Sequence, residues 1–130
     1  MIENRKDFET PSPPPSYAEA FDRAKRQIDW STFDDGDLRW LNEITAIIGE
    51  IYALPSTSNV RISGEWLPSN TVKGVFEKLN EMHIKTVIMQ YNSVSDTIRN
   101  PKAYMRTLLY NSIFSFDAYW TNQYKATNAT

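Results

Sequence analysis

The chain has 130 residues, of which 41% are hydrophobic and 23% are charged, and its net charge is −2. This length and composition suit a single globular domain and exclude a disordered chain. The absence of cysteine excludes disulfides and thiolate metal sites. The sequence has neither the apolar core of a signal peptide nor an apolar run close to the ~20 residues that span a bilayer. We therefore expect a cytoplasmic protein without membrane association.

The first sixteen residues are predicted to form a flexible linker or tail. They contain five charges of mixed sign and then a proline-rich run from Pro11 to Pro15, which cannot form a helix and favours the polyproline II conformation. A first helix should begin after Ser16, because Ser16 and Glu19 have the spacing of a capping box. Its apolar residues recur at helical spacing, namely Tyr17, Ala20, Phe21, Ala24 and Ile28.

A second helix over residues 38–52 has the strongest periodic signal. Its apolar stripe consists of Leu38, Leu41, Ile44, Ile48, Ile51 and Tyr52. Thr45 falls on the same stripe, and its hydroxyl is expected to bond back to the preceding turn. Asp35 and Asp37 lie near the positive end of the helix dipole. This helix is expected to form the centre of the core and to end before Pro55.

The next segment is predicted to form a β-hairpin and two helices. Residues 59–66 alternate apolar and polar around Ser63 and Gly64, with Val60 and Ile62 on one face, which is typical of a short hairpin. A lone hairpin is marginal in water, so it should pack on the helices. A third helix opens at residues 68–70 and carries Val72, Val75, Phe76 and Leu79. A fourth follows a joint at residues 80–82 and carries Ile84, Val87, Ile88, Tyr91 and Val94.

The C-terminal part is predicted to hold a fifth helix and a further helical stretch. Asn100 and Pro101 supply a cap residue and a proline at the first helical position. The fifth helix carries Tyr104, Met105, Leu108, Leu109 and Ile113. The stretch from about Ser115 carries Phe116, Tyr119, Trp120 and Tyr124. The expected fold is therefore mainly α, a bundle-like domain of five to six helices over residues 17–125 with one short β-hairpin and a tail at 126–130.

The residues offer no recognisable catalytic site, so the chain is not expected to be an enzyme or to hold a cofactor or a metal. The four glycines are scattered and form no phosphate-binding loop. His83, the only histidine, lies at the start of an amphipathic helix, where a capping role is commoner than catalysis. Asp34, Asp35 and Asp37 lack the closing glutamate of a calcium loop and are better explained as acids at a helix N-terminus.

Four stretches carry a resemblance to a known family. They are Asp37-Leu38 with Asn42-Glu43-Ile44 and Ile47-Ile48; Val60 to Glu65 with Pro68 and Val72-Lys73; Phe76 with Lys78-Leu79-Asn80, His83-Ile84 and Val87-Ile88; and Ile98 to Met105 with Thr107 to Asn111. In this order, from about Trp30 to Tyr124, the sequence resembles the C-terminal domain of RepA-type replication initiators from plasmids and integrative elements of Firmicutes.

The last stretch is also similar to the signature of DnaD-like primosome proteins. That signature runs Asn-Pro, a Tyr shortly after, a branched apolar residue four positions on, and a Trp four beyond. Asn100, Pro101, Tyr104 and Leu108 fit it, whereas position 112 is Ser. Tyr104 and Leu108 are expected to point inward and to pack in the core, as structural residues of the motif.

The resemblance implies a non-catalytic accessory domain of a replication initiator, which recruits host replication proteins of the primosome or helicase-loading type, with or without weak contact to DNA. Two alternatives stay open, a direct non-specific DNA-binding module and a self-association domain that forms homo-oligomers. Residues 97–130 carry four basic and one acidic side chain, against six and eleven in residues 1–53, so an anionic partner is expected at the C-terminal part. The candidate residues for contact with DNA or a partner are Arg99, Lys102, Arg106, Tyr110 and Lys125.

These candidates have two expected roles. Arg99, Lys102 and Arg106 are expected on the outer face of the fifth helix, where they would neutralise phosphates if DNA is bound. Exposed aromatic residues between positions 110 and 124 would stack on unpaired bases.

Overall fold

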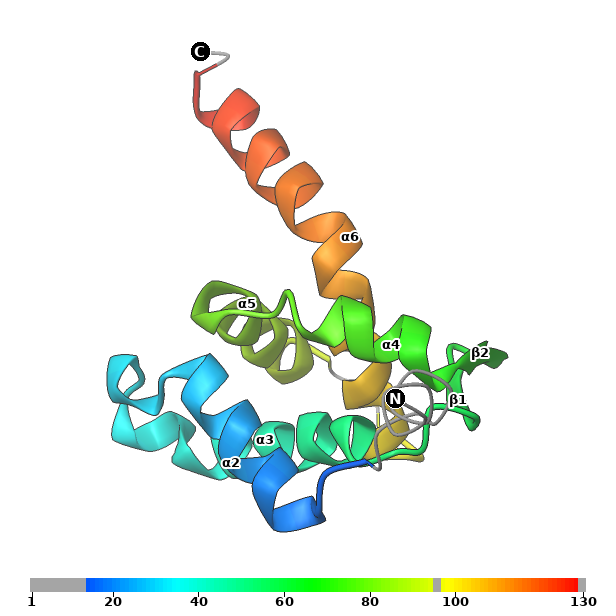
Figure 1. Cartoon of the computed structure of the whole chain (residues 1–130). Helices are drawn as coiled ribbons and strands as arrows, with labels where there is room; N and C mark the ends of the chain where they lie inside the picture. The colour runs from blue at the N-terminus through cyan, green and yellow to red at the C-terminus, as the bar shows by residue number, and fades with distance from the viewer. Residues whose placement is uncertain (1–13, 95–96, 129–130) are drawn as a thin grey trace, which may run out of the picture.

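The computed structural model describes the backbone of residues 14–94 and 97–128, and side chains as far as residue 115. The described residues form five α-helices, two 3-10 turns and one two-stranded hairpin (Figure 1). The helices and strands in chain order are α2 (Tyr17–Ile28), α3 (Leu38–Tyr52), β1 (Asn59–Ile62), β2 (Glu65–Pro68), α4 (Ser69–Phe76), α5 (Glu81–Asn92) and α6 (Pro101–Asn128). The prediction of a mainly α domain with one short β-hairpin is confirmed.

The start of α2 is determined by the predicted capping box. Ser16 Oγ accepts a hydrogen bond from the backbone N–H of Glu19 (3.2 Å), and the backbone N–H of Ser16 donates to Glu19 Oε1 (3.1 Å). The helix ends at Ile28, and the following cap residue Asp29 has a left-handed backbone conformation (φ 61°) that redirects the chain. Residues 1–13, which make up most of the predicted linker, lie outside the described residues.

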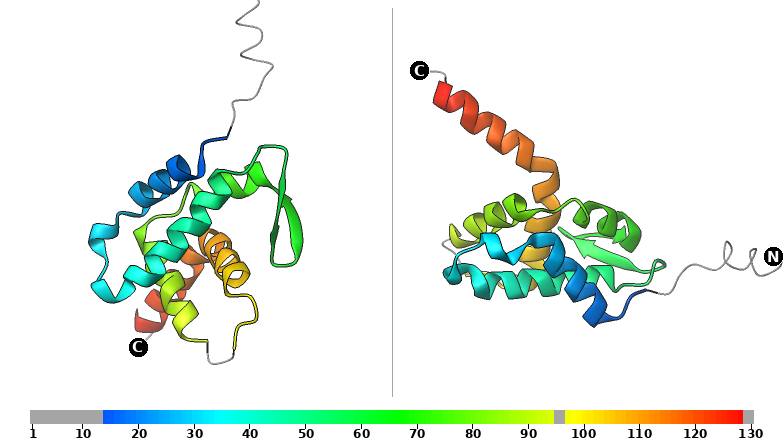
Figure 2. Two further views of the ribbon diagram at one scale, coloured as in Figure 1. Left: turned by 90° about the horizontal axis from the view of Figure 1, so that it is seen from below. Right: turned by 60° about the vertical axis from the view of Figure 1, so that its left-hand side comes forward.

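Helices α2 and α3 pack side by side and run in opposite directions (Figures 1 and 2). The buried hydrophobic residues of this pair are Ala20, Ala24 and Ile28 from α2 and Leu41, Ile44, Ile47, Ile48, Ile51 and Tyr52 from α3. Leu38, which the periodicity placed on the same stripe, is 44% exposed. Gly49 lies where the helices meet, and a Cβ at this position would be 3.1 Å from Phe21 Cα. The glycine therefore allows a close approach of the two backbones.

Trp30 holds the connection between α2 and α3. Its indole Nε1–H donates to Thr45 Oγ1 at 3.1 Å, and Lys25 Nζ lies 4.5 Å from the ring centroid. Thr45 is fully buried, as its place on the stripe predicted. Its hydroxyl, however, accepts from the indole, whereas a bond back to the preceding turn was expected. The indole N–H of this half-buried tryptophan needs an acceptor, and the acceptor it finds, Thr45, lies fifteen residues along the chain.

Strands β1 and β2 pair antiparallel around a two-residue turn, as predicted. Ser63 and Gly64 both have positive φ values (55° and 86°), as a type I′ turn requires. The register sets Arg61 opposite Trp66, and both side chains are exposed on the outer face. The buried residues of the inner face are Val60 and Ile62, both from β1.

A short joint connects α4 to α5. Asn80 Oδ1 accepts the backbone N–H of Met82 (2.9 Å) and of His83 (3.2 Å), and His83 Nδ1 accepts the backbone N–H of Asn80 (3.1 Å). The predicted capping role of His83 is therefore confirmed. Helix α5 ends at Asn92, two residues before Val94, which the spacing had placed in the helix.

Helix α6 is continuous from Pro101 to Asn128. The further helical stretch expected from about Ser115 is therefore part of α6, and the helix continues into the residues 126–130 that were predicted as a tail. Neither proline nor glycine follows Pro101 to interrupt the backbone hydrogen bonds. The first half of α6 packs against α5 and α4, while the second half projects from the body of the domain (Figures 1 and 2). Residues 129 and 130 lie outside the described chain.

A polar network connects α2, α3 and α4. The Tyr52 hydroxyl donates to Gln27 Oε1 (2.5 Å), and Gln27 Nε2 donates to the carbonyl oxygens of Phe76 and Leu79 (2.8 Å each). Burial raises the pKa of Tyr52 to about 12, although the nearby Arg23 guanidinium opposes this shift.

This shift predicts a pH dependence. The pKa of Tyr52 is about 12 in the folded chain, against 10.0 for an unperturbed tyrosine, so its neutral form stabilises the fold fully below about pH 10. That contribution is lost as the pH rises towards 12. We expect the stability difference between the unmodified chain and Tyr52→Phe to be constant up to about pH 10 and to shrink above it. Denaturation at each pH measures this, and a difference constant across the whole range would contradict the raised pKa.

Candidate partner-binding surface

Two hollows lie on either side of the first turns of α6. The hairpin groove, of about 530 Å³, lies between α6 and the hairpin, and the α3 pocket, of about 410 Å³, lies between α6 and α3. Asn100 lines both. The hairpin groove is also lined by Arg61, Ser63, Gly64, Ala103, Tyr104, Arg106 and Thr107. The α3 pocket is also lined by Glu43, Ala46, Ile47, Glu50, Tyr91, Pro101, Lys102 and Met105.

The first turns of α6 position both hollows. Asn100 Oδ1 accepts the backbone N–H of Ala103 (3.1 Å), and Pro101 is the first helical residue, so the predicted helix start is confirmed. Further along α6, Thr107 Oγ1 accepts the backbone N–H of Ser63 (3.2 Å). This bond attaches the hairpin turn to α6, and it therefore holds the two walls of the hairpin groove together.

The hairpin groove is basic. Arg61 and Arg106 line it, and neither forms an ion pair with any residue that the structure describes. Arg106 Nε is buried and has no hydrogen-bond acceptor among those residues. Trp66 is 65% exposed, and its ring centroid lies 5.8 Å from the guanidinium carbon of Arg61. The groove thus combines two unneutralised guanidinium groups with an exposed indole at its edge.

The α3 pocket is acidic. Lys102 Nζ lies 2.7 Å from Glu50 Oε1 and 2.6 Å from Glu50 Oε2. This exposed ion pair contributes only about 0–1 kcal/mol to stability, but it offsets the charge of Lys102. Glu43 is a second carboxylate in the same pocket. The side of α6 that faces α3 therefore does not attract anions.

Arg99 and Lys102 are exposed, as expected for the outer face of α6, whereas Arg106 is half-buried. Lys102 lines the α3 pocket and Arg106 lines the hairpin groove, so the two do not share one hollow. Arg99 lines neither hollow.

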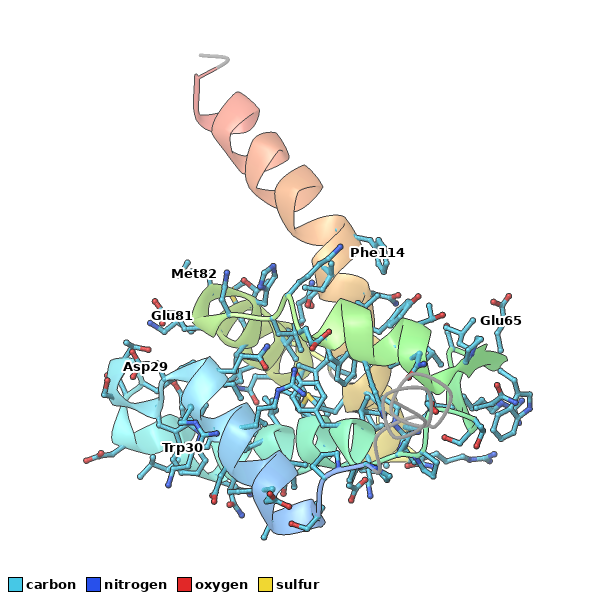
Figure 3. The ribbon with its side chains drawn as sticks, in the orientation of Figure 1. Asp29, Trp30, Glu65, Glu81, Met82 and Phe114 are labelled. Atoms are coloured by element: carbon cyan, nitrogen blue, oxygen red, sulfur yellow. The ribbon has the colours of Figure 1, made fainter. Side chains whose placement is uncertain are left out.

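The other two candidate contact residues lie along α6. Tyr110 is half-buried, and its ring centroid is 5.2 Å from that of Phe114. The side chain of Lys125 lies outside the described residues. Phe114 is 63% exposed and lies where α6 leaves the body of the domain (Figure 3). It was not among the predicted contact residues.

The inward direction predicted for Tyr104 and Leu108 also needs correction. Both are half-buried at the edge of the core, and the buried residues of the described part of α6 are Met105, Leu109 and Ser112. The Tyr104 ring lies against Tyr91 (centroids 5.9 Å apart), which in turn lies against Trp40 (4.7 Å). Ser112, where the DnaD-like signature has Trp, donates its hydroxyl to the carbonyl of Leu109 (2.7 Å).

Residues 14–94 and 97–115, whose side chains the structure describes, contain no group of three histidine or acidic side chains that converges as a metal site. No helix in the described backbone has the length and apolar character needed to cross a bilayer.

Arg61 and Trp66 were missing from the predicted contact residues, although the sequence carries a signal for them. The alternation that turns Val60 and Ile62 inward turns Arg61 outward, and a two-residue turn sets Trp66 opposite Arg61. The approach of α6 to this hairpin depends on the tertiary structure and has no such local signal.

The chain belongs to a protein family described as a family of unknown function (DUF6017), whose model matches residues 22–129. The match includes most of α2 and every later helix and strand. No curated protein and no solved structure matches the chain.

Proposed function

We propose that this member of the DUF6017 family is a non-catalytic accessory domain of a replication initiator, and that it docks a host replication protein of the primosome or helicase-loading type. The observation that carries the docking part is the projection of α6 from the body (Figures 1 and 2). The replication part rests on the resemblance to RepA-type initiators described above.

The projecting part of α6 is the element that most needs a partner. The last buried residue in the described part of this helix is Ser112, and Phe114 just beyond it is 63% exposed. Isolated helices of this length are marginal in water, and most helical stability comes from packing of an apolar face. The sequence has aromatic residues at positions 116, 119, 120 and 124, at spacings of three and four. A helical partner surface would bury such a face.

Direct DNA binding through the predicted cations has less support. Lys102 is paired with Glu50, and Arg106 lies in a groove on the other side of α6 from that pair. A module that binds DNA without sequence preference depends on several phosphate contacts made together. The third possibility, self-association through α6, is separated from docking by the experiment below.

The test is capture of replication proteins from a Firmicutes lysate by the immobilised chain, with bound proteins identified by mass spectrometry. We expect Phe114→Asp to reduce capture about tenfold or more, because it places a charge at the base of the docking helix. The fold should survive, since exposed substitutions usually change stability by about 0.5 kcal/mol or less.

Leu38→Asp is the matched control, because it makes the same kind of change at an exposed apolar residue at the start of α3. Capture by this variant should equal that of the unmodified chain. Enrichment of no replication protein, or equal loss in both variants, would contradict the proposal. A stable dimer that Phe114→Asp dissociates, without any captured protein, would support self-association instead.

A further inference from the structure

The hairpin groove holds two arginines whose charges no described residue neutralises. Elsewhere the described cations include two that are paired, Arg23 with Glu77 and Lys102 with Glu50. Arg61 and Arg106 line the groove without such a partner in the described chain, and Arg106 Nε is buried with no acceptor there. Guanidinium groups that lack a counter-charge pair readily with carboxylates and phosphates. The groove therefore favours a ligand that supplies acceptor oxygens.

We infer that the hairpin groove binds an acidic segment of the docked partner, whose carboxylates pair with Arg61 and Arg106. This inference deepens the proposed docking function and rests on it. Guanidinium groups form short, often bidentate hydrogen bonds with carboxylates. The volume of about 530 Å³ is within the usual range of ligand sites and accommodates a few side chains of an extended peptide.

Trp66 extends this surface beside Arg61. Its indole is 65% exposed, and the hairpin register sets it directly across from Arg61. Tryptophan and arginine are the residue types most often critical in protein interfaces. An acidic segment that also carries an apolar residue matches this pair, because the apolar side chain covers the indole while the carboxylates occupy the groove.

A nucleic-acid backbone fits the groove less well. It presents phosphates in a long row and is bound by an extended series of cations. Only two cations line the groove, while Glu65 lies next to Trp66 on β2 and Glu50 neutralises Lys102 on the far side of α6. Two arginines match one or two carboxylates of a peptide better than a polyphosphate.

The experiment measures binding of a short fluorescein-labelled peptide of glutamate and leucine to the full chain by fluorescence anisotropy. A peptide with glutamine in place of every glutamate is the ligand control. We expect Arg61→Gln and Arg106→Gln each to weaken binding about tenfold, as for the loss of one charge-assisted hydrogen-bonded pair. Arg106→Lys, which keeps the charge without the planar fork, should give a smaller loss.

Arg26→Gln is the control for net charge, because Arg26 is exposed on α2 and lines neither hollow. It should change the affinity by about twofold or less. Arg61 is exposed, so the Arg61→Gln variant is expected to fold. It therefore keeps the test valid even if Arg106→Gln fails to fold. No binding of the glutamate peptide, equal binding of the glutamine peptide, or an affinity unchanged by Arg61→Gln would overturn the inference.

A labelled oligothymidine and inorganic phosphate serve as competing ligands. Unlabelled glutamate peptide gives the reference concentration for displacement of the labelled peptide. If oligothymidine or phosphate displaces it at a lower concentration, and this displacement is lost in the same arginine variants, the groove is a phosphate site and the inference is wrong. The lysate capture separates this result from the docking proposal. Capture that requires Phe114 but is unaffected by Arg61→Gln would support docking and refute the role of the groove in it. Peptide binding without captured replication proteins would refute the replication role alone.

Discussion

Replacing Leu109 with alanine is expected to lower the free energy of unfolding by about 2–5 kcal/mol, through lost contacts and a residual cavity. Leu109 is fully buried on the half of α6 that packs against α5 and α4, and Met105, one turn earlier, is 2% exposed. A loss of this size is a large share of the ~5–15 kcal/mol that stabilises a typical domain. Urea denaturation followed by circular dichroism measures it.

Leu108→Ala is the matched control, because it removes the same side chain one position earlier. Leu108 is only half-buried, so we expect a loss of about 1 kcal/mol, in proportion to the smaller apolar area removed from water. Equal losses at the two positions would mean that the Tyr104–Leu108 side of α6 is covered as fully as the other. The orientation of α6 about its own axis, in which Met105 and Leu109 face the core, would then be wrong.

Local signals in the sequence predicted where most elements begin and which faces they bury. The capping box of Ser16 and Glu19 joins residues three apart, and the hairpin turn at Ser63 and Gly64 depends on the conformation of two adjacent residues. The periodicity of residues 38–52 is similarly contained within one helix. Such features were predictable because each depends on a few neighbouring residues.

The rotation of α6 depends on what packs against it. Tyr104 with Leu108, and Met105 with Leu109, form two adjacent apolar stripes of the same spacing, and the pattern alone favours neither. Contact with α5 and α4 buries the second stripe. The projection of α6 was unpredictable for a similar reason. Periodicity shows that residues can form a helix, but it does not show how far along that helix the neighbouring helices extend.

The candidate site was only partly predictable because its contacts join distant parts of the chain. Lys102 pairs with Glu50, which is 52 positions away in the sequence, and Thr107 bonds to Ser63, which is 44 positions away. The sequence identified Lys102 and Arg106 as basic residues one turn apart, but only the packing of α6 between α3 and the hairpin assigns them to two different hollows.

Gly49→Ala is expected to destabilise the fold, although alanine is the better helix former. In a helix interior, the change from glycine to alanine alone gains about 0.5–1 kcal/mol. At position 49, however, the new Cβ would lie 3.1 Å from Cα and 3.2 Å from N of Phe21. These are backbone atoms of α2, so α2 and α3 must move apart. Overpacking of this kind costs about 1–3 kcal/mol, and the expected net loss is measured by urea denaturation.

Gly74→Ala separates helix propensity from packing. Gly74 lies within α4, and apart from its chain neighbours and the nearby backbone of α4 itself, no described atom would come within 4 Å of its new Cβ. We therefore expect only the propensity gain there, about 0.5–1 kcal/mol. Enlarging position 49 further to leucine should raise the loss above about 3 kcal/mol, because a whole side chain must then fit between α2 and α3. If Gly49→Ala stabilised the chain as much as Gly74→Ala, the two helices would lie farther apart than the contact with Phe21 requires, and their close packing would be refuted.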